Sequence, residues 1–163
     1  MKRTIRIKRW LPYNTEDVWN AVTNAKMLGS WFMENDLEPV INHEFTFRKP
    51  PQRGWDGMTY CKVIAVEPMR YIAFTYRGKA SGEKTLACAG IQSETANKSV
   101  KGIFTELDTV LSFTLTGDGN GTSLLLEHSG YKGLKLVIVS FVMGMGWKKL
   151  MKKLAAVLEK GNN

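Results

Sequence analysis

The sequence predicts an α+β domain in which a curved antiparallel sheet is wrapped around a long C-terminal helix. Three observations lead to this prediction. Residues 147–158 carry apolar side chains at helical spacing, with four lysines on the opposite side. Much of the preceding chain alternates apolar and polar residues, which is typical of half-buried strands. Strands that follow one another through short turns favour antiparallel pairing, and an amphipathic helix needs a broad apolar surface to cover.

Composition sets the limits of the prediction. The chain has 163 residues, of which 44% are hydrophobic, and a net charge of +8. This length suits a single domain over residues 1–163. There is no signal-like apolar run, and Cys61 and Cys88 lack a partner motif, so we expect a cytoplasmic protein with reduced thiols. The longest nearly uncharged apolar stretch, residues 136–147, is too short to span a bilayer. The basic residues are dispersed, so we expect a solvated basic surface and no specific nucleic-acid partner.

The first third of the chain predicts one strand and two short helices. Residues 4–10 alternate, with Ile5 and Ile7 on one face. A helix then opens near Thr15, with Asn14 or Thr15 as N-cap and acidic residues in its first turn. A second short helix is predicted over residues 25–32, and it turns four apolar side chains inward: Met27, Leu28, Trp31 and Phe32.

The middle of the chain predicts strands over residues 40–48, 58–67, 71–77, 107–116 and 122–129. The last two form a hairpin across the glycine-rich residues 117–121. A phosphate loop is not expected there, because such loops lie between a strand and a helix. The segment from Gly78 to Glu106 is polar and weakly periodic. A short strand at residues 85–89 and a long mobile loop both remain open for it.

Sequence marks spread over almost the whole chain resemble those of one family. In order, they are Val18-Trp19, Trp31-Phe32, Val66-Glu67-Pro68 with Tyr71-Ile72-Ala73-Phe74-Thr75-Tyr76, Phe113-Thr114-Leu115-Thr116, His128-Ser129-Gly130-Tyr131, Gly146-Trp147 and Leu158-Glu159. Together they resemble the homologues of the C-terminal domain of the activator of the 90-kDa heat-shock chaperone ATPase (Aha-like proteins). This family lies in the SRPBCC superfamily of START and birch-pollen-allergen-like proteins. The resemblance implies the helix-grip fold and favours a ligand cavity between the sheet and the last helix.

Three features depart from the family pattern. Asn42-His43 stands where two glycines are frequent, the segment from Gly78 to Glu106 is longer than usual, and the segment after Tyr131 is apolar instead of acidic. The chaperone activators also carry an N-terminal domain for which this chain has no room. We therefore expect non-enzymatic binding of a small hydrophobic or amphipathic molecule. A chaperone-associated interaction module is the alternative, and a cyclase-type enzyme, as found in the wider superfamily, is the second alternative.

The expected ligand-binding residues face the core from the predicted strands and helices: Trp31, Phe45, Phe47, Phe74, Tyr76, Phe113, Leu115, Leu126, His128 and Trp147. His128 shares its face with Leu126, which would place it at the mouth of the cavity. An imidazole there could bind a polar head group or exchange a proton. The alternatives are a histidine bonded to a loop carbonyl and a plain packed core. Arg77 is a weaker polar anchor, because it alternates to the face opposite Tyr76.

Other chemistries find little support in the pattern. His43, Cys61, Cys88 and His128 are isolated, whereas zinc sites usually show paired ligands at short spacing, so we expect no metal. Nothing near either cysteine marks it as activated. The carboxylates are scattered over the strands, and no pair is placed for acid–base catalysis. The sequence thus predicts no catalytic residue and no cofactor.

The segment from Leu134 to Val142 is apolar all round if it is helical, and its Val-Ile-Val sequence would also suit a strand. One helix on one sheet cannot bury all of these side chains. An exposed apolar patch of this kind usually marks a contact surface. We therefore expect the segment to pack against a second copy in a homodimer, or to be covered by the segment from Gly78 to Glu106. If the protein is a monomer, that segment or a lipid surface remains as the cover.

Overall fold

A computed structural model describes residues 1–51, 56–78 and 107–161. The elements in chain order are β1 (Lys2–Leu11), α1 (Thr15–Thr23), α2 (Ala25–Trp31), β2 (Glu34–Asn35), β3 (Glu44–Arg48), β4 (Met58–Glu67), β5 (Tyr71–Arg77), β6 (Asp108–Gly117), β7 (Thr122–Lys132) and α4 (Leu134–Gly161). The strands form one antiparallel sheet in the order β1-β7-β6-β5-β4-β3-β2. This is the predicted helix-grip arrangement.

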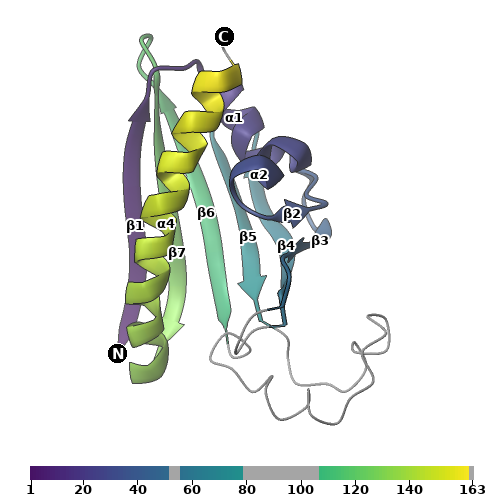
Figure 1. Cartoon of the computed structure of the whole chain (residues 1–163), viewed down its shortest axis with the longest axis vertical. Coiled ribbons are helices and arrows are strands. Elements are labelled where there is room, and N and C mark those ends of the chain that lie inside the picture. The colour runs from purple at the N-terminus through teal and green to yellow at the C-terminus, as the bar shows by residue number, and fades with distance from the viewer. Residues whose placement is uncertain (52–55, 79–106, 162–163) are drawn as a thin grey trace.

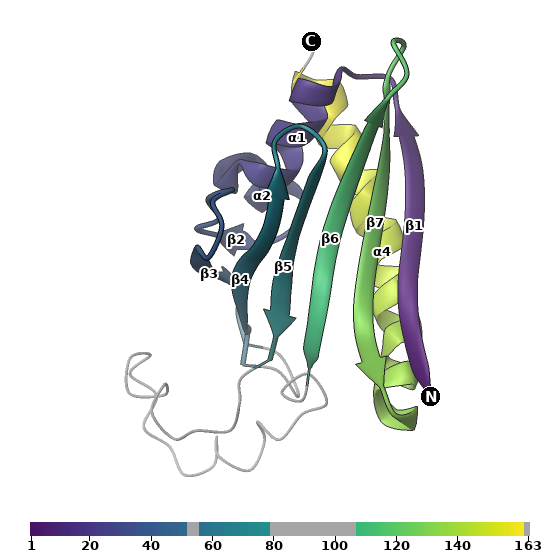
Figure 2. The same cartoon turned by 180° about the vertical axis from the view of Figure 1, so that it is seen from behind.

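Within the part of the chain that the structure describes, the helices α1, α2 and α4 lie on one side of the sheet. Figure 1 shows α4 running along β1 and β7, with α1 and α2 beside it over the other strands. From behind, in Figure 2, the strands stand in front of the helices. The core therefore lies between one sheet face and this layer of helices. The predicted features within residues 79–106, including the strand at 85–89, lie outside the described residues.

Asparagine N-caps define where the two short helices begin. The Asn14 side chain accepts a hydrogen bond from the Asp17 N–H at 2.8 Å, which confirms Asn14 as the N-cap of α1. Asn24 ends α1 and also caps α2, through the Met27 N–H at 3.1 Å. The Trp31 indole N–H donates to the Ala21 carbonyl at 2.8 Å and ties α2 to α1. The pair therefore holds Trp31 fully inside the core.

The strand predicted over residues 40–48 begins later than expected. β3 starts at Glu44, while Val40 and Ile41 are half exposed in the preceding turn. Asn42 adopts a left-handed conformation with φ of 66°, which asparagine tolerates better than most residues. This turn reverses the chain between β2 and β3. The sequence did not reveal β2, because two residues are too few to show an alternation.

The hairpin between β6 and β7 confirms the turn predicted at residues 117–121. One carboxylate oxygen of Asp118 accepts the N–H groups of Asn120 and Gly121, at 2.9 and 2.8 Å. The other accepts the Trp10 indole N–H at 3.0 Å. These donors favour the ionised carboxylate and lower the pKa of Asp118, the Asn120 N–H first among them. Hydrogen bonds to the Asp118 carboxylate therefore stabilise this turn.

The strand predicted to end at Ser129 continues to Lys132 through a β-bulge. Across β1, Arg3 pairs with Tyr131 and Ile5 pairs with His128, so the register shifts by one residue between them. Gly130 sits at this shift with φ of 99°. A bulge with glycine in a left-handed conformation adds one residue and turns the following side chain around. His128 and Tyr131, three residues apart, therefore both face the core.

The C-terminal helix is longer than the amphipathic pattern alone suggested. α4 runs without interruption from Leu134 to Gly161, so the apolar segment is its first part and not a strand. Its buried residues lie on one side: Val137, Val139, Ser140, Trp147, Met151, Leu154 and Leu158. Among the described residues, no helix is long and apolar enough to cross a membrane.

Candidate functional site

The ten side chains predicted to bind a ligand lie together in the core between the sheet and the helices. They come from α2, β3, β5, β6, β7 and α4, and none of them exposes more than 5% of its surface. The alternation of each strand places them on the covered face of the sheet. The structure therefore brings the predicted set into one buried cluster.

Ring contacts connect most of this cluster. Phe45 lies 5.1 Å from Phe74 between ring centroids, and Phe47 lies 5.9 Å from Phe74. Phe32, which the sequence placed inward but not in the site, contacts Phe47 at 4.7 Å and Trp147 at 4.9 Å. Phe32 thus links the β3 side of the cluster to α4. The sequence could have indicated this role, because Phe32 ends the inward-facing apolar side of the predicted second helix.

His128 is the polar centre of this cluster and is completely buried. The Trp147 indole N–H donates to His128 Nδ1 at 3.0 Å, and the Tyr131 hydroxyl lies 2.9 Å from the same nitrogen. On the other side, His128 Nε2 lies 2.8 Å from Thr109 Oγ1, and that hydroxyl donates to the Tyr76 carbonyl at 2.7 Å. His128 therefore bonds to side chains inside the core, and not to a loop carbonyl.

The donors around His128 define its tautomer. An indole N–H can only donate, so Nδ1 of His128 must be the accepting nitrogen. The proton then resides on Nε2, which donates to Thr109 Oγ1. The network accordingly connects α4 to β7, β6 and β5 through neutral groups. Thr109 and Tyr131 are members that the sequence did not predict for the site. Tyr131 was noted only as a family mark, because the bulge breaks the alternation that would place it in the core.

Burial keeps the whole network uncharged. Loss of solvation lowers the pKa of His128 to about 3. Burial also raises the pKa of both Tyr76 and Tyr131 well above the ordinary value for tyrosine. At neutral pH the site is therefore aromatic with a few neutral hydrogen-bonding groups. Such a site suits a mostly apolar molecule better than a charged one.

Arg77 and the metal candidates lie apart from this cluster. Arg77 points to the other face, where its Nε lies 2.7 Å from a carboxylate oxygen of Asp108. His43 Nε2 lies 2.9 Å from the Asp36 carbonyl, and Cys61 is a buried thiol whose pKa is raised by burial. Cys88 lies outside the described residues. Within residues 1–51, 56–78 and 107–161, no group of three metal-ligating side chains comes together.

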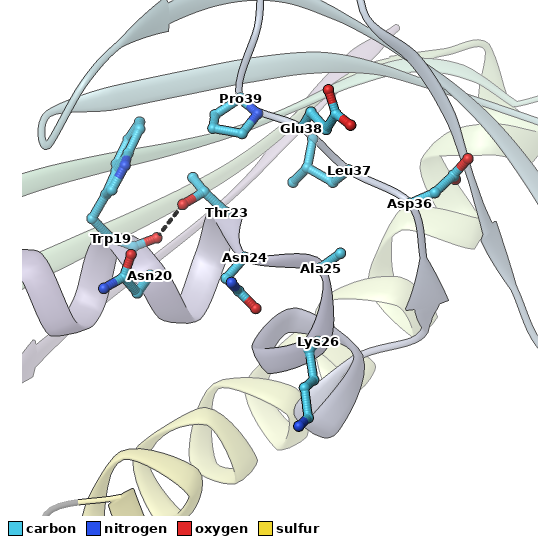
Figure 3. Close-up of a pocket in the computed structure, with 10 residues that line it drawn as sticks. All are labelled: Trp19, Asn20, Thr23, Asn24, Ala25, Lys26, Asp36, Leu37, Glu38 and Pro39. Atoms are coloured by element: carbon cyan, nitrogen blue, oxygen red, sulfur yellow. Dashed lines mark hydrogen bonds between the residues drawn. The ribbon is translucent and has the colours of Figure 1, made fainter.

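A hollow of about 610 Å³ lies on the surface where α1 meets α2, apart from this cluster. Figure 3 shows its wall: the end of α1 with Trp19 and Thr23, the Asn24 cap, and the segment from Asp36 to Pro39. Several of its polar groups already hold the local fold. Thr23 donates to the Trp19 carbonyl at 2.7 Å, and Asp36 accepts the Thr46 N–H at 3.0 Å. The sequence did not predict this hollow, because its wall forms only when the two helices pack.

A comparison of the chain with known protein families finds a match over most of its length. The family model described as "Activator of Hsp90 ATPase homolog 1-like protein" matches residues 12–159. No curated protein is significantly similar to the chain.

Several solved structures share the fold over nearly the whole chain. Protein MLL2253 from Mesorhizobium loti is 26% identical, with a TM-score of 0.75 over 97% of this chain and 98% of that one. Protein BH1534 from Bacillus halodurans is 25% identical, with a TM-score of 0.68 over 97% and 99%. The Aha1 dimer from Colwellia psychrerythraea is 17% identical, with a TM-score of 0.69 over 99% of both chains, and this likeness shows the fold alone.

Proposed function

Because the chain belongs to the family of proteins like the activator of Hsp90 ATPase homolog 1, we propose that it binds a small hydrophobic or amphipathic molecule between the sheet and α4. One observation supports this most directly. Ten aromatic, aliphatic and imidazole side chains from six elements meet there around the neutral polar group of His128. Ligand pockets have this composition, with mostly apolar walls and a few polar groups that orient the ligand.

Binding at this position requires some of the packed core side chains to move apart. The rings of the cluster contact one another, so a ligand takes its place by displacing side chains. The His128–Trp147 hydrogen bond joins the sheet to α4 and can be exchanged for a bond to the ligand. A hydroxyl or carbonyl group on an otherwise apolar molecule would satisfy either partner. The reduced, cytoplasmic setting expected from the cysteines is part of this proposal.

1-Decanol, an uncharged medium-chain alcohol, is a suitable first probe. A ligand that binds the folded state raises the melting temperature. Its place can be followed through the indole N–H resonances in NMR spectra, assigned by single Trp→Phe substitutions. Signals from Trp31 and Trp147 should shift on titration, whereas that of Trp10, bonded to Asp118 outside the cluster, should stay unchanged.

A variant with added bulk provides the second arm of this test. Leu126 lies wholly within the cluster, so Leu126→Trp should abolish decanol binding. Overpacking costs about 1–3 kcal/mol, so the variant must first be shown to be folded. A melting temperature raised without movement of the Trp31 and Trp147 signals would locate decanol elsewhere and refute the site.

A chaperone-associated role is the second candidate, and the description of the matching family is the observation that favours it. A fold hosts many functions, so this argument is one of analogy. The direct measurement is the ATPase rate of a 90-kDa heat-shock chaperone with and without the purified chain. An unchanged rate at saturating concentration would leave ligand binding as the sole proposal.

A further inference from the structure

The first half of α4 exposes an apolar stripe to solvent. It consists of five large side chains, each 57–63% exposed: Leu134, Ile138, Phe141, Val142 and Met145. Their spacing puts them on one side of the helix, opposite the residues that pack on the sheet. Isolated exposed apolar residues are common, but a continuous stripe of this size marks a contact surface. We call this set the α4 stripe.

The same side of α4 becomes basic in its second half. Lys148, Lys149, Lys152 and Lys153 are all exposed, and they continue the line of the α4 stripe. The sequence has no acidic residue between Glu127 and Glu159. One helix face therefore presents an apolar half followed by a cationic half, with no carboxylate among them.

A groove of about 260 Å³ lies beside the stripe, between β1 and α4. Its apolar wall includes Ile5, Ile7, Phe141 and Met145, and its charged residues are Arg3, Arg6 and Lys148. The Arg3 guanidinium lies 3.8 Å from the Phe141 ring centroid and donates to Ser140 Oγ at 2.7 Å. Arg6 pairs with Glu127 at 2.8 Å, but no carboxylate of the described residues pairs with Arg3 or Lys148.

We propose that the α4 stripe and this groove dock the protein onto an anionic phospholipid surface. The apolar side chains would enter the boundary between head groups and acyl chains, and the neighbouring cations would contact lipid phosphates. This is how amphipathic helices lie on membranes, and each basic residue near an anionic surface adds to the attraction. The stripe is about 16 Å long at 1.5 Å per residue, enough to lie in the interface but not to cross a bilayer.

A second copy of the chain fits this surface less well, although the sequence alone favoured one. Two identical faces would pair their apolar side chains, but their charged groups would be only lysines and arginines, with no carboxylate on this face of α4 to pair with them. A stable dimer usually buries about 800 Å² on each partner. The α4 stripe is one helix wide, and an apolar patch of this kind covers a few hundred Å². An anionic phospholipid surface would bury the apolar side chains and also neutralise the positive charges beside them.

Flotation with vesicles tests the proposal directly. The intact chain should float with vesicles of phosphatidylcholine and phosphatidylglycerol, but remain in solution with phosphatidylcholine alone. Ile138→Asp and Val142→Asp should abolish flotation, and the exposure of both residues means that the fold is retained. Val40→Asp is the matched control, because Val40 is 55% exposed near the opposite edge of the sheet. It should float like the unmodified protein.

The lysines provide an independent measurement on the same vesicles. Lys148→Gln and Lys152→Gln should each weaken binding about fivefold, the equivalent of about 1 kcal/mol per basic residue, and added salt should weaken it further. Failure of the unmodified chain to float, or equal loss with Val40→Asp, overturns the proposal. So does a lipid-free dimer in sedimentation that Ile138→Asp converts to a monomer, since a second copy would then occupy the stripe. None of these outcomes depends on decanol binding in the core.

Discussion

His128 shows how one residue takes its properties from its surroundings. It lies inside the core, where three groups on two strands and one helix surround its two nitrogens. Its position inward followed from the alternation of β7, but its neutrality follows from burial, which lowers its pKa to about 3. The imidazole is therefore a hydrogen-bonding centre in the folded protein and not a charged one.

This residue predicts a dependence of stability on acid pH. The unfolded chain takes up a proton near the ordinary histidine pKa of about 6.5, whereas the folded chain does so only near 3. Between these values the unfolded state binds more protons, so the free energy of unfolding falls as the pH falls. The slope contributed approaches about 1.4 kcal/mol per pH unit. Urea unfolding at several pH values should show it in the unmodified protein and not in His128→Gln; His43→Gln is the matched control and should keep it.

Trp147 predicts a large loss of stability when truncated. It is 2% exposed, contacts Phe32 and donates to His128, so Trp147→Ala should lower the free energy of unfolding by about 3–5 kcal/mol. Trp147→Phe keeps most of the ring and should cost less, about 1–2 kcal/mol, mainly the lost hydrogen bond. A loss below about 0.5 kcal/mol for Trp147→Ala in chemical denaturation would contradict this burial.

At the scale of elements, small irregularities decide which residues meet. The bulge at Gly130 turns Tyr131 to the same side as His128, and without it the two would face opposite sides of β7. The register of α4 has a similar effect, because it buries Trp147 and leaves the α4 stripe outside. Both features therefore bring together side chains that are separated in the sequence.

The bulge predicts a position-specific glycine requirement. A Cβ on Gly130 would lie 3.1 Å from the Asp108 carbonyl and from Thr109 Cα, and φ is 99°. Gly130→Ala should therefore destabilise by about 2–3 kcal/mol through strain and crowding together. Gly133→Ala has a similar φ of 82° but no atom near the new Cβ, so about 1 kcal/mol is expected. Equal losses for the two variants, measured by urea unfolding, would show that crowding at the bulge is unimportant.

For the whole molecule, the net charge of +8 predicts weak attraction to any polyanion. Binding to DNA should be independent of sequence and should fall steeply with salt, because only phosphate contacts are available. Fluorescence anisotropy with two unrelated duplexes at several salt concentrations measures both properties. Tight, selective binding to one duplex at physiological salt would contradict the expectation of no specific nucleic-acid partner.

Local patterns were sufficient to predict much of this molecule. The strands Met58–Glu67 and Tyr71–Arg77, the cap at Asn14, the hairpin turn and the inward face of each strand were predicted because alternation, capping and turn chemistry act over a few residues. The ten core residues followed from the same alternation and from the family resemblance.

Contacts between distant parts of the chain decided the rest. The two-residue β2 exists only through its pairing with β3, and the bulge at Gly130 is visible only against β1. Trp147 meets His128 across nineteen residues, and Arg3 meets Ser140 across 137 residues. The outer face of α4 likewise became defined only when the sheet had buried the other side. These features depend on which surfaces pack together, and a local pattern carries no information about that partner.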